Sequence, residues 1–255
     1  MTKESNLNSS RSYEAFTLSP EPSYKHTTYF QAYDVLLGKY CGQEVTIVEI
    51  GILNGGSLFM WREFFGPQAR IIGIDLNPEA KKWEEFGFEI FTGSQQDPVF
   101  WNEFCQQVGK VDIVIDDGGH TYPQQIITSE CVLDNINDGG VLIVEDTHTS
   151  YMNGFGDKKM SFLNYVIQFI HKINSRFSKF DKLQKDQRVF SIQIFESIVA
   201  FNVNREKSSL KSEPIWNREP EHEPAKDFRF DDKSSSTSRK NAETILKNAF
   251  MLYQK

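Results

Sequence analysis

The chain has 255 residues and a formal net charge of −7. This negative balance argues against broad electrostatic binding to nucleic acid or to an anionic membrane, and it favours a small-molecule partner. Hydrophobic residues make up 39% of the chain and include 21 Phe, 9 Tyr and 4 Trp, so we expect a globular protein with a substantial core.

Signals for export or membrane insertion are missing from the sequence. No run approaches the ~18 consecutive apolar residues of a membrane span, and residues 1–10 lack the basic start and apolar middle of a secretory signal. We therefore expect a cytoplasmic protein. Cys41, Cys105 and Cys131 are widely spaced and form no C-x-x-C pair, which predicts reduced packing residues.

The N-terminal part of the chain changes character near residue 24. Residues 1–23 are polar and rich in Ser, Glu and Pro, which predicts a flexible arm. Residues 27–40 then carry aromatic and leucine side chains at helical spacing, which predicts a helix packed on the main body. We expect the main domain to span residues 24–204.

Between Val45 and about Val144, five short β-branched runs alternate with amphipathic segments. The runs are VTIVEI, RIIGID, FEIFTG, VDIVID and VLIVED. Strands that alternate with helices predict a parallel sheet covered by helices on both faces.

The C-terminal third adds helices and one hairpin to this pattern. Residues 160–174 predict a long helix, and two apolar runs within residues 189–203 predict an antiparallel pair that closes the sheet edge. Residues 205–240 predict a loop or partly disordered segment, and residues 241–255 predict a final helix. The expected fold class is α/β, with a Rossmann-like, doubly wound sheet of about seven strands that is mostly parallel.

A glycine-rich turn follows the first predicted strand and contains Gly51, Asn54, Gly55, Gly56 and Ser57. Glycines permit close approach of a ligand to the backbone, and the next helix offers its N-terminus to an anionic group. The spacing G-x-x-x-G-G differs from the G-x-G-x-x-G of dinucleotide binders, which disfavours a nicotinamide cofactor.

Asp75 ends the second predicted strand, where a carboxylate can accept hydrogen bonds from both ribose hydroxyls. A glycine-rich turn with an acidic strand end favours a nucleoside-containing cofactor. The alternative is that the glycines only form a tight turn and that Asp75 caps the next helix.

Two pairs of carboxylates end neighbouring predicted strands: Asp116 with Asp117, and Glu145 with Asp146. Carboxylates crowded at one edge of a sheet repel one another unless a cation neutralises them. An all-oxygen set suits Mg²⁺, with Mn²⁺ or Ca²⁺ as alternatives, and does not suit structural zinc. The competing interpretation is that one pair caps a helix and the other is a solvated loop.

His120 follows Asp117 by three residues, across two glycines. An imidazole placed there can stand beside a metal without ligating it and can remove a proton from a hydroxyl that the metal has made more acidic. His148 is a weaker candidate for this role, and His171 falls in a helical pattern typical of a packed or surface residue. A purely structural role for His120 is the alternative.

The glycine turn combined with Asp75 resembles the class I S-adenosylmethionine-dependent methyltransferases. This resemblance implies that the turn surrounds the methionine end of the cofactor, that Asp75 holds the ribose, and that the loop after the third strand borders the adenine. The expected cofactor-binding residues are Glu49, Gly51, Asn54, Gly55, Gly56, Ser57, Asp75, Ser94, Gln95 and Asp116.

The motif DDGGH, followed about 25 residues later by GGVLIVEDTHTSY, narrows the resemblance. It is similar to the metal-dependent sugar O-methyltransferases of antibiotic biosynthesis, including macrolide and rhamnosyl methyltransferases, and to the related cephalosporin hydroxylase-like proteins. The similarity covers about residues 25–151. It implies Asp117, Glu145 and Asp146 as metal ligands and His120 as the general base.

We therefore expect an O-methyltransferase that uses S-adenosylmethionine and Mg²⁺ on a small, sugar-containing acceptor, with no nucleic-acid or membrane partner. A homo-oligomer is compatible with the sequence. Tyr29, Tyr122 and Tyr151 are candidates to complete the pocket or, equally, to pack in the core. Three alternatives stay open: a different diol or catechol-like acceptor, a non-catalytic adenosylmethionine-binding partner protein, and an NAD-linked oxidoreductase.

Overall fold

The computed structural model describes residues 9–177, 180, 184–218 and 236–250. The chain forms two compact units, Met1–Glu213 and Pro214–Lys255. The first unit holds a single sheet with its flanking helices, and the second holds helix α9 (Ser236–Phe250). This helix begins five residues before the predicted start at 241, and residues 251–255 lie outside the described residues.

The first unit is built on a seven-stranded sheet with the strand order β3-β2-β1-β4-β5-β7-β6. The first five of these strands are parallel, and β7 pairs antiparallel with both β5 and β6. The expected fold class, including the antiparallel edge hairpin, is confirmed. The strands are β1 (Thr46–Ile50), β2 (Arg70–Asp75), β3 (Glu89–Thr92), β4 (Val111–Asp116), β5 (Ile136–Val144), β6 (Val189–Phe195) and β7 (Ile198–Val203).

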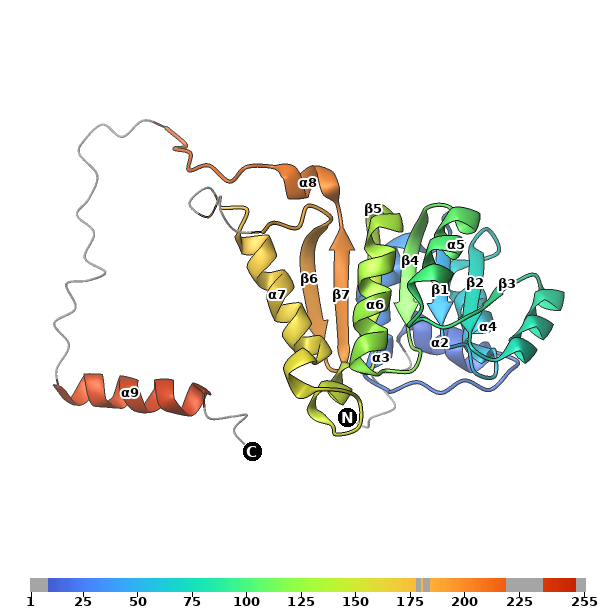
Figure 1. The fold of residues 1–255 in the computed structure, drawn as a ribbon, viewed down its shortest axis with the longest axis horizontal. Helices are drawn as coiled ribbons and strands as arrows, with labels where there is room; N and C mark the ends of the chain where they lie inside the picture. Colours follow the sequence, from blue (N-terminus) through green and yellow to red (C-terminus); the bar gives the residue numbers. More distant parts are fainter. Residues whose placement is uncertain (1–8, 178–179, 181–183, 219–235, 251–255) are drawn as a thin grey trace. The chain divides into compact units, whose positions relative to one another are not determined.

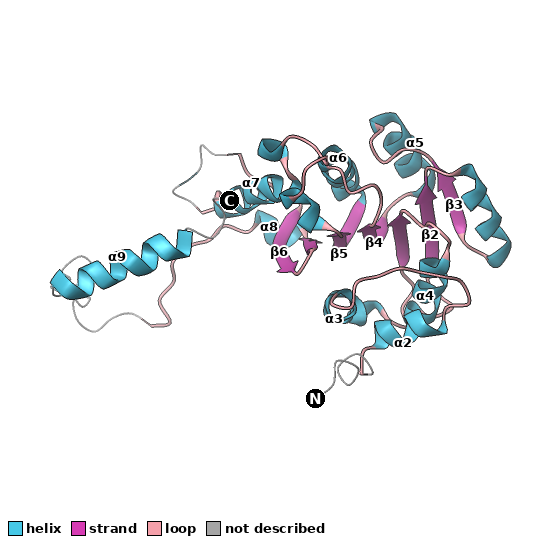
Figure 2. Ribbon diagram, turned by 90° about the horizontal axis from the view of Figure 1, so that it is seen from below, coloured by secondary structure: helices cyan, strands magenta, loops and turns pink. Residues whose placement is uncertain are grey.

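Helices cover both faces of the sheet, as Figures 1 and 2 show. One face packs against α2 (Arg11–Leu18), α3 (Tyr29–Leu37) and α4 (Gly56–Phe65), and the other against α5 (Pro98–Val108), α6 (Tyr122–Val132) and α7 (Phe162–Asn174). Successive strand residues point to opposite faces, so Ile47 joins the first hydrophobic cluster and Val48 the second. Because both faces are buried, the strands read as continuous apolar runs.

The N-terminal segment differs from the flexible arm predicted for residues 1–23. Helix α2 starts after Ser10, whose hydroxyl accepts a hydrogen bond from the Tyr13 amide at 3.2 Å. Ser12 donates its hydroxyl proton to the Phe30 carbonyl, and Ala15 is buried. The helix is only two turns long and half of its residues are polar, so its sequence gives a weak helical signal. Residues 1–8 lie outside the described residues.

The segment predicted as a loop over residues 205–240 begins with a short helix, α8 (Arg205–Ser209). Arg205 fastens it to the sheet through an ion pair with Asp138 at 2.6 Å. Residues 210–218 form no regular element, and residues 219–235 lie outside the described residues. Among the helices described, none is long and apolar enough to cross a lipid bilayer.

The parallel strands bring their carboxyl ends to one rim of the sheet. The ladder continues one residue past the strands, because the amides of Gly51, Asp117 and Glu145 donate to the carbonyls of Ile74, Ile50 and Asp116 at 2.8, 3.0 and 2.9 Å. These bonds fix the loops that follow β1, β4 and β5 side by side. Side chains from distant parts of the sequence therefore converge on this rim.

Phe201 on β7 tests the packing that closes the sheet. Its side chain is fully buried, and its ring lies 5.2 Å from that of Phe169 on α7. We expect Phe201→Ala to lower the free energy of unfolding by about 3–5 kcal/mol, because it leaves a cavity. Phe190→Ala on β6 is the matched control: this ring is 43% exposed, so the loss should stay below about 1 kcal/mol. Urea unfolding followed by circular dichroism measures both, and equal losses would contradict the arrangement.

Candidate active site

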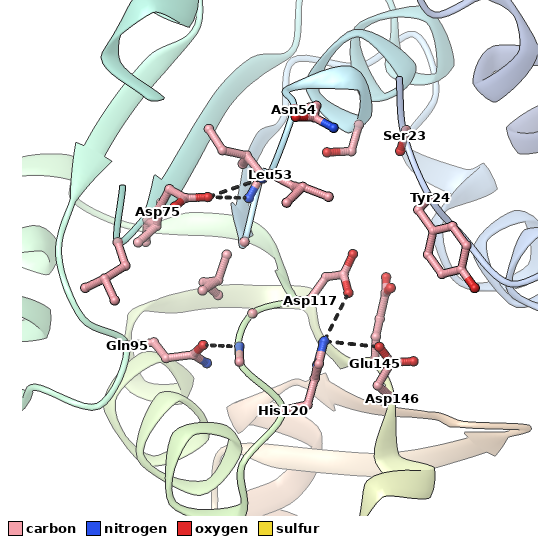
Figure 3. A pocket seen from close by; sticks show the side chains of 18 of the residues that line it. Ser23, Tyr24, Leu53, Asn54, Asp75, Gln95, Asp117, His120, Glu145 and Asp146 are labelled. Atoms are coloured by element: carbon pink, nitrogen blue, oxygen red, sulfur yellow. Dashed lines mark hydrogen bonds and ion pairs between the residues drawn. The ribbon is translucent and has the colours of Figure 1, made fainter. Parts of the chain in front are cut away.

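A cavity of about 490 Å³ opens at the carboxyl rim of the sheet. Figure 3 shows its two sides. The glycine half consists of residues after β1, β2 and β3, and the acidic half consists of residues after β4 and β5. The glycine half contains Gly51, Asn54, Gly56, Ser57, Asp75, Ser94 and Gln95, and the acidic half contains Asp117, His120, Glu145 and Asp146.

The glycines of the turn are required mainly by neighbouring protein atoms. Gly51 has φ of +83°, and a Cβ there would overlap the Asp117 carbonyl. A Cβ on Gly56 would overlap the carbonyl oxygens of Glu21 and Pro22. The sequence reasoning attributed these glycines to the approach of a ligand; in the structure, other backbone segments already lie against them. Gly51 and Gly56 still line the cavity, whereas Gly55 does not.

Asp75 lies at the cavity wall and also organises the turn. One of its carboxylate oxygens accepts hydrogen bonds from the amides of Ile52 and Leu53 at 3.1 and 3.2 Å, as drawn in Figure 3. The other accepts from the Asn77 amide at 2.8 Å. Each carboxylate oxygen has more than one lone pair, so the group can still receive a ligand hydroxyl.

Two residues expected to bind the cofactor are buried behind the cavity. Glu49 accepts a hydrogen bond from the Ser57 hydroxyl at 2.6 Å, and Asp116 accepts one from Gln95 at 2.9 Å. Neither lines the cavity. Burial raises the pKa of Asp116 to about 6, although the hydrogen bonds from Gln95 and the Gly118 amide act in the opposite direction. Asp116 thus ties the loops after β3 and β4 together.

Asp117, His120 and Asp146 face one another across the acidic half. The His120 Nε2 atom lies 3.2 Å from Asp146 Oδ2 and 3.9 Å from Asp117 Oδ1. One potential ligand atom from each of the three residues falls within 4.8 Å of the others. His120 and Asp146 have φ of 58° and 54°, and such left-handed backbone at non-glycine residues is strained and concentrates at functional sites.

Glu145 lies beside this group, lines the cavity and is fully buried. Its Oε1 atom accepts a hydrogen bond from the Tyr33 hydroxyl at 2.5 Å, and its Oε2 atom accepts one from Lys25 at 3.1 Å. Helix α3 supplies a second phenol, because the Tyr29 hydroxyl donates to Asp146. Burial raises the pKa of Glu145, against the opposing positive charge of Lys25.

Lys25 is the residue that sequence reasoning missed. Its ammonium lies 2.6 Å from Asp117, 3.1 Å from Glu145 and 3.6 Å from Glu49, and its side chain is only 2% exposed. Burial works to lower the pKa of Lys25, but the surrounding carboxylates outweigh it and raise the pKa well above its ordinary value. A single lysine in a polar stretch gives no sequence signal of burial, so only its position before a helix rich in tyrosine hinted at a role.

Two further imidazoles border Asp146. The ring nitrogens of His26 and His148 each lie 3.8 Å from Asp146 Oδ1. Of the tyrosines considered for the pocket, Tyr29 lines the cavity, and Tyr122 is buried with its hydroxyl donating to the Thr149 and Met152 carbonyls. Tyr151 is 59% exposed and does not line the cavity.

Residues 48–147 match the model of a family described as a methyltransferase domain. The matched segment is similar to that family and covers less than half of the chain. It runs from β1 through the loop after β5 and so includes the glycine half and the acidic half. The cavity residues that precede β1 lie outside it.

Curated relatives match about half of this chain. Mycinamicin VI 2''-O-methyltransferase of Micromonospora griseorubida is 33% identical over 131 residues, which are 49% of this chain and 32% of the relative. An 8-demethyl-8-(2-methoxy-alpha-L-rhamnosyl)-tetracenomycin-C 3'-O-methyltransferase of Streptomyces olivaceus is 36% identical over 121 residues, 45% of this chain and 30% of the relative. The matches span about a third of the length of these relatives. The expected resemblance to sugar O-methyltransferases is confirmed.

Solved structures share the fold. The MycE methyltransferase of the mycinamycin pathway, in complex with Mg, SAH and mycinamycin VI, superposes with a TM-score of 0.68 at 23% identity. The match covers 83% of this chain and 57% of that one. The matched part of this chain therefore shares its fold with the matched part of MycE.

Tyr33 tests the polar network behind the acidic half. Tyr33→Phe removes the hydroxyl that donates to the buried Glu145, and we expect it to lower the free energy of unfolding by about 1.5–3 kcal/mol, because hydrogen bonds to charged groups are strong. Tyr40→Phe is the control, since its hydroxyl donates to the neutral Gly139 carbonyl and should contribute about 1 kcal/mol. Urea titration of both variants compares them, and a larger loss in Tyr40→Phe would be incompatible with this network.

Proposed function

We propose that the protein is an S-adenosylmethionine-dependent O-methyltransferase that requires a divalent metal and acts on a hydroxyl of a sugar-containing small molecule. The observation that carries the proposal is that a single cavity joins the glycine half, with Asp75, to the group formed by Asp117, His120 and Asp146. A cofactor site and an acid–base site thus share one space.

The named relatives support the choice of acceptor class. Their names give mycinamicin VI and a rhamnosyl-tetracenomycin C as the molecules that they O-methylate, and the MycE complex holds Mg, SAH and mycinamycin VI. We extend that chemistry to this chain through the 121 to 135 residues over which the relatives match it.

The cavity suits a cationic cofactor. Glu49, Asp117, Glu145 and Asp146 bring four carboxylates to this rim and Lys25 brings one ammonium, so acidic groups are in excess. This excess favours cations, including the sulfonium of S-adenosylmethionine. When bound, the cofactor supplies an electrophilic methyl group. Asp75, which lines the glycine half, would accept hydrogen bonds from its ribose.

The acidic half also suits a hard divalent cation. Carboxylate oxygens from the loops after β4 and β5 are the donors that Mg²⁺ and Mn²⁺ prefer. Asp117, Glu145 and Asp146 would hold the metal. When bound, it supplies Lewis acidity that makes a nearby acceptor hydroxyl easier to deprotonate.

His120 would move the proton. Its Nε2 atom lines the cavity beside Asp146, and its Nδ1 atom is buried with no hydrogen-bond partner among the described residues. The imidazole accepts the proton of the acceptor hydroxyl, and the facing Asp146 carboxylate stabilises the imidazolium that results. Transfer of the methyl group of a bound S-adenosylmethionine to the acceptor oxygen would leave neutral S-adenosylhomocysteine, and a water-poor cavity would favour this loss of charge.

Asp75 gives a test of the cofactor site. We expect Asp75→Ala to weaken S-adenosylmethionine binding by about 10- to 100-fold, because charge-assisted hydrogen bonds to the ribose are lost. Asp97→Ala is the control: this carboxylate caps α5 at the Val99 amide and does not line the cavity. Calorimetric titration with and without EDTA measures both, and unchanged affinity in Asp75→Ala would remove the ribose assignment.

His120 and Asp117 give a test of the chemistry. With Mg²⁺ and a panel of macrolide and rhamnosyl glycosides, we expect His120→Ala to lower kcat by about 10²- to 10⁴-fold while cofactor affinity stays unchanged. We expect Asp117→Asn to lose turnover, with cofactor affinity again retained. His171→Ala, at an exposed position of α7, is the control for loss of an imidazole. Full turnover in EDTA would exclude the metal, and full turnover in His120→Ala would exclude the base.

A further inference from the structure

The Lys25 ammonium is hydrogen-bonded to carboxylate oxygens that would be ligands of the proposed metal. Its ammonium is the hydrogen-bond donor to Asp117 Oδ2 and to Glu145 Oε2, at 2.6 and 3.1 Å. Asp117 Oδ1 is the oxygen that faces His120. The ammonium thus engages two of the three residues proposed to hold the metal, from the side of the buried Glu49.

An ammonium and a divalent cation repel each other at such distances, and little water screens them because the Lys25 side chain is 2% exposed. Both would draw on the charge of the same carboxylates. Metal entry must therefore either displace the ammonium or overcome its repulsion, and in both cases Lys25 weakens the binding of the metal.

Lys25 also fastens a stretch of chain over the glycine half. The segment Ser19–Thr28 runs from the end of α2 to the start of α3, and the carbonyl oxygens of Glu21 and Pro22 lie against Gly56. The Ser19 hydroxyl donates to the Gly56 carbonyl at 2.8 Å. Within the described part of the chain, the backbone of residues 22–25 makes no hydrogen bond of its own. The ammonium therefore provides the main polar contacts that hold the middle of this segment in place. Pro22, Ser23 and Tyr24 of the segment line the cavity.

We propose that Lys25 is a tethered counter-ion that competes with the divalent metal for Asp117 and Glu145, so that metal binding releases the segment Ser19–Thr28 from the acidic half. This inference rests on the proposed metal dependence. It assigns to Lys25 a positioning role: the residue neutralises the rim in the metal-free protein and holds the wall of the cavity in place.

The first test is metal affinity, measured with Mn²⁺ by electron paramagnetic resonance. We expect Lys25→Met to bind Mn²⁺ at least about 10-fold more tightly than wild type, because the competing charge is gone. Lys25→Arg, which keeps the charge, should bind no more tightly than wild type. Lys110→Met is the matched control, since Lys110 is exposed and immediately precedes β4, at the amino ends of the parallel strands and away from the cavity. Thermal unfolding checks that each variant is folded.

The second test needs no variant. Amine acetylation of wild type, followed by mass spectrometry, should label buried Lys25 much more slowly than exposed Lys110 without metal. Addition of Mn²⁺ should speed labelling of Lys25 and leave that of Lys110 unchanged.

Equal Mn²⁺ affinity in Lys25→Met and wild type would overturn the competition, as would labelling of Lys25 that does not respond to Mn²⁺. Either result leaves the proposed methyl transfer intact. Absence of Mn²⁺ binding to both wild type and Lys25→Met would overturn the competition and the metal requirement together, whereas failure to bind S-adenosylmethionine would count against the proposed function alone.

Discussion

Mutual repulsion among carboxylates is the constraint around which this rim of the sheet is organised. Glu49 is the penultimate residue of β1, and Asp117, Glu145 and Asp146 follow β4 and β5. Glu49 and Glu145 are fully buried. Charges taken out of water are unfavourable unless they are paired and hydrogen-bonded. The groups that meet this need come from the chain before β1: one ammonium from Lys25 and two phenols from α3. A single positive charge is too little for four negative ones, and the remaining demand for positive charge is what makes the cavity suitable for a metal and a sulfonium.

The same contacts link stability to function. Tyr33 and Lys25 hold Glu145 inside the protein, while Asp117 has one oxygen toward Lys25 and the other toward His120. A substitution of Asp117 would therefore alter the contacts of Lys25, which also binds the Glu145 carboxylate beneath α3, and the contacts of His120 in the cavity. The hydrogen bonds that extend the ladder past β1, β4 and β5 keep these loops in register, so the carboxylates and the glycine turn have fixed relative positions.

The sequence predicted those features that depend on local pattern. Runs such as VDIVID marked the strands, the two apolar runs of residues 189–203 marked the hairpin, and the paired acids marked the rim. It did not reveal Lys25, because the hydrogen-bond partners of this residue, Asp117 and Glu145, lie 92 and 120 positions further along the chain. Helix α2 was missed because it is short and half of its residues are polar. The reason for glycine at position 56 was also out of reach, since the crowding atoms belong to Glu21 and Pro22.

The placement of Lys25 bears on where this balanced set of charges begins. The matched family region starts at residue 48, yet the cation and both phenols that balance its acids lie upstream, between residues 25 and 33. A fragment trimmed to the matched region would keep all four acids but lose Lys25 and both phenols. The set of charges that balance one another at this rim therefore extends upstream of the matched region, at least to Lys25.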